Sequence, residues 1–355
     1  MKSEVRKIDY TGQEIYCGLD VHKKRWQITV CTKHTIQKPV SIERPFVQNL
    51  KRHLEKKYPG GIYHVAYEAG FSGFGAHKAM EENGMKSMVV HAADIPTTDK
   101  DRKQKNDKRD SRKIAISLRS GELVGIYVPS DIALQDRSIV RERWSLARSE
   151  RRVKNQIKSH LMFFGVDVPD DLENRYWSRR FIKWLQQIRK ERDDRALGLK
   201  LERLMLIRQN MLNAVQALRK LSTEERHQKS YRILRSVPGI GLLTAMLLIV
   251  ELIDIRRFPR FDELCSYTGF IPTTRSTGEK ETMGELTNRK NQRIMPALVQ
   301  SSWVSIKSDP ELLMKYENYR KKMGGQKAII KIARILLRRI QVIWSKEILY
   351  QKAEC

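Results

Sequence analysis

IYCGLDVHKKRWQITVC, residues 15–31, is the stretch that indicates the fold of the first part of the chain. Apolar and β-branched residues stand on both sides of its polar VHKK segment, which predicts two strands joined by a tight turn. Residues 62–68 (IYHVAYE) and 86–92 (KSMVVHA) predict two further strands, and residues 76–83 predict a helix that Gly84 ends. Strands that alternate with helices indicate an α/β or mixed domain.

We expect three parts along the chain: an α/β domain over residues 1–130, a helical region over 131–226 and a mainly helical domain over 227–355. Glycine almost disappears from the helical region, and apolar residues recur there at helical spacing among many Arg and Lys. This pattern predicts long helices, either as a coiled-coil hairpin or as a solvated spacer. Residues 328–345 predict a basic amphipathic helix in the last domain.

The charge of the chain indicates its class of partner. Lys and Arg number 69 against 41 Asp and Glu, which gives a net charge of +28. A protein field of this sign attracts polyanions, and neutralised phosphates release counterions from nucleic acid. We therefore expect DNA or RNA as the partner, with a merely soluble, ribosomal or membrane-surface basic protein as the alternative.

The cysteines and the apolar stretches limit the classes further. Cys17, Cys31, Cys265 and Cys355 form no CxxC pair, which argues against a zinc site and a disulfide framework and fits a reducing cytoplasm. The most apolar stretch, residues 240–250, is too short to span a bilayer. The polar N-terminus predicts no signal peptide, so we expect a cytoplasmic protein with no membrane partner.

Four carboxylates stand where a metal site could form. Asp20 and Glu68 end two predicted strands, where a buried acid is costly unless it is solvated, paired or bound to a cation. Asp107 and Asp110, three residues apart, share one face at the start of a predicted helix. The four acids could together hold two Mg²⁺ ions on a phosphodiester, although each one alone is more often a turn or helix cap.

Two further motifs lie in the last domain. Val237–Gly241 (VPGIG) predicts a helix-hairpin-helix turn, in which Gly239 and Gly241 expose N–H groups to a phosphate, unless the turn only connects helices. Residues 275–280 (RSTGEK) predict a polar loop with hydroxyl groups beside a glycine. Such a hydroxyl can act as a nucleophile, but an ordinary turn is the more frequent explanation of this motif alone.

These motifs occur together in one order. They are GLDVHK around Asp20, YEAG around Glu68, NDKRD at 106–110, SVPGIG at 236–241 and SYTGFIP, STGEK and GELT within 266–287. The ordered set resembles the insertion-sequence 110 (and 1111) family of transposases, which are bacterial mobile-element recombinases. The resemblance covers nearly the whole chain.

The resemblance implies a RuvC-like (RNase H-fold) DEDD catalytic domain, a coiled-coil region and a C-terminal transposase domain. It implies that Asp20, Glu68, Asp107 and Asp110 are the metal ligands. It also implies a covalent serine–DNA intermediate, an element-encoded bridge RNA that pairs with donor and target DNA, and a homo-oligomer, dimeric or tetrameric, in the bacterial nucleoid.

The hydroxyl motif departs from the family by one position. The family serine often stands immediately before the glycine, where this chain has Thr277, and Ser276 comes one residue earlier. We favour Ser276 as the nucleophile and keep Thr277 as the alternative, with Arg275 and Lys280 stabilising the transition-state charge. Two other functions remain open: a RuvC-like nuclease that uses water, and a catalytically decayed nucleic-acid-binding protein.

Overall fold

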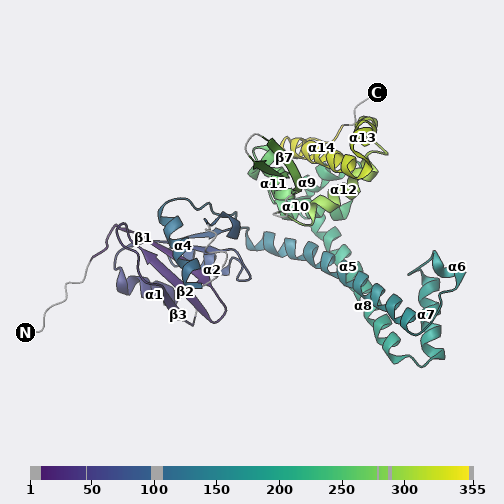
Figure 1. Ribbon diagram of the computed structural model, residues 1–355, viewed down its shortest axis with the longest axis horizontal. Helices are drawn as coiled ribbons and strands as arrows, with labels where there is room; N and C mark the ends of the chain where they lie inside the picture. The colour runs from purple at the N-terminus through teal and green to yellow at the C-terminus, as the bar shows by residue number, and fades with distance from the viewer. Residues whose placement is uncertain (1–8, 45, 97–106, 278–279, 287–289, 352–355) are drawn as a thin grey trace, which may run out of the picture. The chain divides into compact units, whose positions relative to one another are not determined.

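The computed structural model describes residues 9–44, 46–96, 107–277, 280–286 and 290–351 (Figure 1). Of residues 107–108, 272–277 and 280–286 the backbone alone is described. The chain divides into two compact units, Met1–Val128 and Pro129–Cys355.

The first unit is built on a mixed five-stranded sheet in the order β3-β2-β1-β4-β5. Its strands are β1 (Glu14–Val21), β2 (Arg25–Cys31), β3 (Val40–Glu43), β4 (Ile62–Glu68) and β5 (Lys86–Val90). β1 pairs antiparallel with β2 and parallel with β4, and β4 pairs parallel with β5. The predicted hairpin and the strand over 62–68 are confirmed, and the strand predicted over 86–92 ends two residues early.

Helices cover both faces of this sheet. α1 (Val47–Lys57) and α2 (Gly75–Glu82) bury Leu50, Leu54 and Met80 against one face. The short η1 (Ala92–Asp94) follows β5, and α4 (Asp107–Arg119) contacts β1, β2 and β4. Ile114 of α4 packs with Ala66 of β4 in a separate small core. The predicted α/β character of this part is confirmed.

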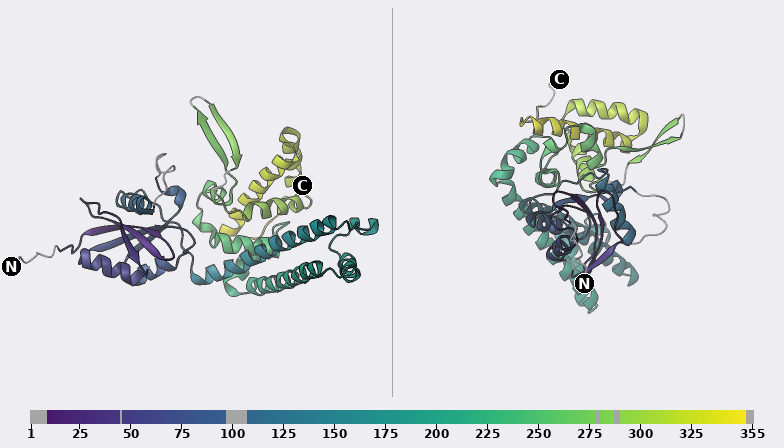
Figure 2. Two further views of the ribbon diagram at one scale, coloured as in Figure 1. Left: turned by 60° about the horizontal axis from the view of Figure 1, so that its bottom comes forward. Right: turned by 90° about the vertical axis from the view of Figure 1, so that its left-hand side faces the viewer.

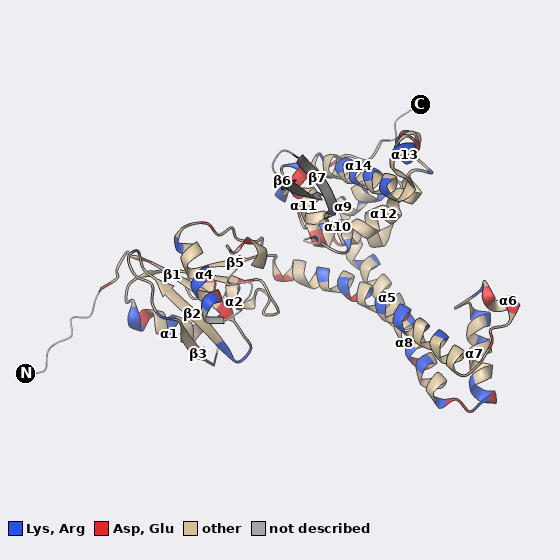
Figure 3. Ribbon diagram, viewed as in Figure 1, with Lys and Arg blue, Asp and Glu red and all other residues tan. Residues whose placement is uncertain are grey.

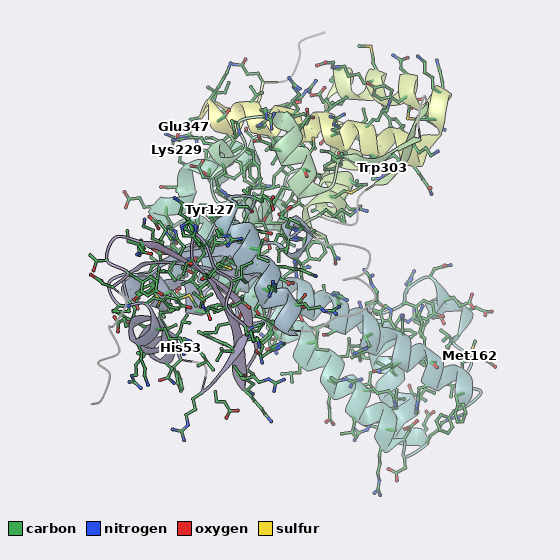
Figure 4. All side chains as sticks on the ribbon, turned by 60° about the vertical axis from the view of Figure 1, so that its left-hand side comes forward. His53, Tyr127, Met162, Lys229, Trp303 and Glu347 are labelled. Carbon is green, nitrogen blue, oxygen red and sulfur yellow. The ribbon has the colours of Figure 1, made fainter. Side chains whose placement is uncertain are left out.

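The second unit begins with a helical hairpin. α5 (Asp131–Phe163) and α8 (Arg195–Ser222) lie side by side and antiparallel, as Figure 2 shows, with α6 (Asp170–Glu173) and α7 (Arg179–Glu191) between them in sequence. Apolar side chains of α5, α7 and α8 form the core of this hairpin. Figure 4 shows the exposed Met162 near its free end. The predicted long helices are confirmed.

The remaining helices of the second unit share one hydrophobic core with α10 (Leu242–Leu252), in which every residue from Ala245 onward is buried. They are α9 (Glu225–Arg235), η2 (Ile255–Arg257), α11 (Phe261–Thr268), α12 (Ile294–Ser305), α13 (Pro310–Met323) and α14 (Gly325–Ser345). α14 buries one face, as its amphipathic pattern predicts. An ion pair between Lys229 and Glu347 ties α9 to the segment after α14 (Figure 4). No helix among the described residues is long and apolar enough to cross a membrane.

The expectation that residues 275–280 form a polar loop is wrong. The chain forms an antiparallel hairpin there, with strands β6 (Pro272–Thr277) and β7 (Lys280–Leu286). The physical reason lies in the sequence PTTRST, whose β-branched threonines favour an extended backbone. The glycine that follows is typical of a hairpin turn rather than of a long loop.

A buried carboxylate joins α5 to α9. Asp136 accepts hydrogen bonds from Arg226 Nε at 3.0 Å and Nη2 at 3.0 Å, and its Oδ2 lies 2.7 Å from His227 Nε2. Burial opposes ionisation of Asp136, but the hydrogen bonds from Arg226 and His227 outweigh it and hold the carboxyl pKa below its usual value.

We expect Asp136→Asn to lower the free energy of unfolding by about 2 kcal/mol at pH 7, the usual scale for hydrogen bonds to a charged group. A carboxyl with a depressed pKa contributes its full stabilisation above its unfolded pKa, which is about 3.9 for Asp. This stabilisation is lost as the pH falls through the folded pKa. The difference from the parent chain should therefore shrink on acidification. Urea unfolding between neutral pH and about pH 3 measures it, and a constant difference would contradict the ion-pair explanation.

Candidate functional site

Asp20 and Glu68 lie side by side at the carboxyl ends of parallel strands. β1 and β4 are aligned with Leu19 beside Tyr67, so the next residues on both strands are the two acids. Leu19 and Tyr67 point into the core under α1 and α2. Since side chains alternate along a strand, Asp20 and Glu68 point to the opposite face, the one that α4 covers.

α4 runs antiparallel to β1, which brings its first turn to the same edge. The Ser111 hydroxyl lies 2.9 Å from the Thr29 hydroxyl on β2, and Arg119 Nη1 donates to the Thr32 carbonyl at 3.3 Å, beyond the end of β2. Asp110 immediately precedes Ser111 and so lies toward the end of β1 that carries Asp20. The backbone of Asp107 begins α4, and its side chain lies outside the described residues.

Asp20, Glu68 and Asp110, the three acids whose side chains are described, do not form a ligand set for a common ion. His22 Nε2 lies 3.1 Å from Asp20 Oδ2, and Lys113 Nζ lies 3.7 Å from Asp110 Oδ1. Across the described side chains, which exclude Asp107, no three acidic, imidazole or thiol groups lie close enough together to hold a metal ion. The donor chemistry nevertheless suits Mg²⁺, which prefers carboxylate oxygens and keeps several waters.

Gly18 makes this arrangement sterically feasible. A Cβ at this position would overlap the Ser111 carbonyl oxygen and the Ala115 amide nitrogen, so α4 rests directly on the backbone of β1. Gly18 is two residues before Asp20, on the same face of the sheet. The close approach of α4 therefore sets the distance between the acids of its first turn and the acids at the ends of β1 and β4.

We expect Gly18→Ala to lower the free energy of unfolding by about 1–3 kcal/mol, because the added methyl group must push backbone away. The displacement of α4 should also reduce any activity that needs Asp110. Gly75→Ala is the matched control, since a Cβ there meets nothing within 4 Å. Thermal unfolding of both variants measures the effect, and equal melting temperatures would show that α4 does not rest on Gly18.

A small cavity lies at the carboxyl end of β1, against α1 and α2, and the sequence did not predict it. It has a volume of about 360 Å³, and its lining includes His22, Lys23 and the aromatic side chains of Trp26, Phe46 and Phe71. Phe46 is 64% exposed and Phe71 is 74% exposed, which is unusual for phenylalanine. Its signal in the sequence is the aromatic content of the glycine-rich AGFSGFG segment, which contains Phe71.

In the second unit, the VPGIG turn joins α9 to α10 as the sequence predicts. Gly239 has φ +82°, and a Cβ there would overlap the Ser301 carbonyl of α12, so this glycine is required by packing. Gly241 is the N-cap of α10 and has open space around it. Arg235 Nη1 donates to the Ile240 carbonyl at 2.7 Å, which places a cation beside the first turn of α10.

The hydroxyl motif lies at the distal end of the β6–β7 hairpin. In the backbone register Ser276 is opposite Glu281 and Thr277 is opposite Lys280, while Arg275 is opposite Thr282. The side chains of residues 272–289 lie outside the described residues. Their backbone places Ser276 and Thr277 at the end of β6, next to the point where the chain reverses.

A buried ionic network, which the sequence reasoning did not foresee, holds the base of this hairpin. Glu251 of α10 is fully buried and accepts hydrogen bonds from Arg141 Nε and Nη2, both at 2.9 Å, and from Asn291 Nδ2 at 3.0 Å. The Asn291 backbone N–H donates to the Tyr267 backbone carbonyl at 2.8 Å, and the Tyr267 hydroxyl donates to the Glu251 backbone carbonyl at 3.1 Å. The network joins α5 and α10 to the chain on both sides of the hairpin.

The charge state of Glu251 follows from its partners. Burial raises the pKa of this carboxyl, but the hydrogen bonds and charge of Arg141, with the charges of Arg137 and Arg293, outweigh burial and hold it below its usual value. Glu251 is therefore an anion inside the protein. In the sequence, Glu251 stands out only as the end of the apolar stretch, because its arginine partners are far away along the chain.

Comparison with known proteins assigns both halves of the chain to one group. Residues 17–165 match a family model for DEDD transposases of the IS110 type, and residues 231–317 match the model described as Transposase IS116/IS110/IS902 family. The first match contains Asp20, Glu68 and Asp110, and the second contains the VPGIG turn and the hairpin.

Curated relatives agree with these matches. A putative transposase of Sinorhizobium fredii is 28% identical over 71% of this chain, which spans 61% of the relative's own length. The transposase for insertion sequence element IS1533 of Leptospira borgpetersenii is 26% identical over 82% of this chain and 85% of its own. The transposase for IS1111A of Coxiella burnetii is 23% identical over 55% of this chain and 53% of its own. With both family models matched in order and relatives of one kind, the chain belongs to the IS110 family of transposases.

Proposed function

We propose that this chain cuts and rejoins DNA by Mg²⁺-dependent phosphoryl transfer, with acids of the first unit and a hydroxyl of the β6–β7 hairpin as its reacting groups. The observation that carries the proposal is the meeting of Asp20, Glu68 and the first turn of α4 at one edge of the sheet. In this assignment Asp107 completes the acid set. The mixed sheet with helices on both faces supports an RNase H/RuvC-like catalytic domain over residues 1–130.

Asp20, Glu68, Asp107 and Asp110 would hold the metal. Bound Mg²⁺ supplies charge neutralisation and polarisation of the scissile phosphate. Carboxylates at strand ends and at a helix start suit this task, because the rigid sheet fixes two of them and Gly18 fixes the approach of the helix.

The hydroxyl oxygen of Ser276, or of Thr277, attacks the phosphorus of the scissile phosphodiester. The bond from phosphorus to the DNA 3′ oxygen breaks, and that oxygen leaves as a 3′-hydroxyl with the proton lost by the side chain. The phosphoester conserves the bond, so a second 3′-hydroxyl can displace the side chain and rejoin the strands. Arg275 and Lys280 stabilise the added negative charge of the transition state.

The partners follow from the same assignment. Donor and target DNA are the substrates, and an element-encoded bridge RNA supplies sequence recognition by base pairing. In this proposal the chain assembles as a dimer or tetramer through the helical region over 131–226 and the C-terminal transposase domain over 227–355. Gly241 and the first turn of α10 contact a phosphate, as does Gly239 through its backbone.

The test is a search for a protein–DNA adduct that survives denaturation, with Mg²⁺, co-purified RNA and DNA spanning the element's junction and target. We expect an adduct that Ser276→Ala abolishes, or Thr277→Ala if that residue is the nucleophile. Thr274→Ala, another hydroxyl on β6, is the matched control. Cleaved DNA without an adduct would replace the proposal by a nuclease that uses water. Normal adducts in both variants would eliminate these two residues.

A further inference from the structure

An arginine-lined cavity lies between α5 and the segment that follows the β6–β7 hairpin. It has a volume of about 880 Å³ and includes Trp144 and Gln292 in its lining. Its arginines are Arg141, Arg143, Arg148, Arg151, Arg152 and Arg293, and its described lining contains no acidic residue. Only Arg141 among the α5 members has a carboxylate partner, the buried Glu251.

Three of these arginines have no countercharge. Within the described part of the chain, no ion pair involves Arg148, Arg151 or Arg152, and all three are exposed. Their neighbour Lys154, by contrast, pairs with Glu150 at 2.8 Å, and Arg208 pairs with the same carboxylate. Uncompensated arginines held on one rigid helix repel one another, and a polyanion would relieve that repulsion.

A second cavity continues the same basic surface toward the free end of the hairpin. Its volume is about 1,370 Å³, and it shares Arg148, Arg151 and Arg152 with the first cavity. Lys200 and Arg203 add the charges of α8. Figure 3 shows Lys and Arg distributed along both α5 and α8.

We propose that these two cavities form one binding site for the phosphodiester backbone of a nucleic acid, a proposal that rests on the nucleic-acid function proposed above. Arg141 and Arg152 are eleven residues apart, which is roughly 17 Å along a helix. That length corresponds to about five base-pair steps along the axis of a duplex, at ~3.4 Å of axial rise per step. Arginine also suits phosphate, because its planar guanidinium donates two parallel hydrogen bonds to phosphate oxygens.

Two details of the first cavity favour a nucleic acid over an acidic protein. Arg143 Nε is buried and has no hydrogen-bond partner among the described residues, so this lining residue can donate a hydrogen bond to a ligand. Trp144 is the cavity's one aromatic lining residue, and its half-buried indole gives a base a surface for stacking. Arg293 connects the site to the hairpin, since its amide donates to Asn291 Oδ1 at 3.0 Å.

The test compares two triple variants of the full chain that lose equal charge. Arg148→Gln/Arg151→Gln/Arg152→Gln removes the shared arginines of the two cavities. Arg179→Gln/Lys183→Gln/Lys190→Gln removes three exposed charges of α7, which lines neither cavity. Both are made with Asp20→Asn, so that strand cleavage plays no part in the measurement. The probes are a labelled duplex DNA and a labelled single-stranded RNA, each titrated at several salt concentrations.

We expect the first triple variant to raise Kd about 10–100-fold for at least one probe, and to reduce the slope of log K against log salt by about 2–3. The α7 variant should change both quantities little. The weakened probe identifies whether DNA or RNA occupies the site. Equal losses in both triple variants, or binding that neither changes, would overturn the site. Selective loss of binding, together with a parent chain that retains Asp20 and does not cleave DNA, would leave the site standing and reject the proposed reaction.

Discussion

Asp20→Asn is expected to lower the rate of DNA cleavage about a thousandfold or more, with the affinity for DNA almost unchanged. Asp20 lies at the carboxyl end of β1 beside Glu68, and its Oδ2 lies 3.1 Å from His22 Nε2. Its carboxylate is therefore central among the acids that meet at this edge of the sheet. A bound metal lowers the barrier to phosphoryl transfer by several kcal/mol, and each ~1.4 kcal/mol is tenfold in rate. Asparagine keeps the shape of the side chain but removes the charge that holds the ion.

The matched control is Glu14→Gln, which removes an acid from the opposite end of the same strand. Its expected cleavage rate is close to that of the parent chain. Titration with Mg²⁺ adds a second measurement, since Asp20→Asn should need more metal for any remaining cleavage while Glu14→Gln should not. Full activity in Asp20→Asn with an unchanged melting temperature would remove this carboxylate from the reaction.

The sheet and its acids could be predicted because the signals are local. Apolar and β-branched residues on both sides of VHKK indicate β1 and β2, and acids at strand ends follow directly from the strand boundaries. The alignment of Leu19 with Tyr67, which makes Asp20 and Glu68 neighbours, depends on a pairing across some fifty residues. Sequence patterns alone contain no such register.

The hairpin and the ionic network show two further limits. RSTGEK consists of polar residues that are typical of a loop, and these residues led to the loop prediction. The threonines beside it favour an extended backbone, and this preference agrees with the strand that forms. Glu251 meets Arg141 across more than a hundred residues, and the pairing exists only because α10 packs against α5. Gly239 is predicted to contact a phosphate through its backbone, and its surroundings add a packing requirement against α12 that the sequence did not indicate.

Glu251→Ala should produce the largest loss of stability in the second unit. Removing one partner of a buried ion pair leaves the other charge uncompensated and typically costs about 3–5 kcal/mol. Here Arg137 and Arg141 would both lose their carboxylate, and Asn291 would lose its acceptor at the base of the hairpin. Chemical denaturation measures the loss, and Asp262→Ala on α11, whose side chain is 80% exposed and lies 3.4 Å from Arg334, is a control that should change stability little.

The triple variant Glu251→Leu/Arg137→Met/Arg141→Met removes the carboxylate together with both arginines that pair with it, and so separates the effect of the buried charges from the anchoring of the hairpin. Replacing both partners of a buried pair by apolar side chains of similar size can restore much of the stability. Asn291 would still lack its acceptor, so the hairpin base should remain loosened and adduct formation should stay low while the melting temperature recovers. Recovery of both quantities would mean that Glu251 serves the fold alone. Recovery of stability without adduct formation, at an unchanged affinity for DNA, would make Glu251 a positioning residue for the hairpin that carries Ser276 and Thr277.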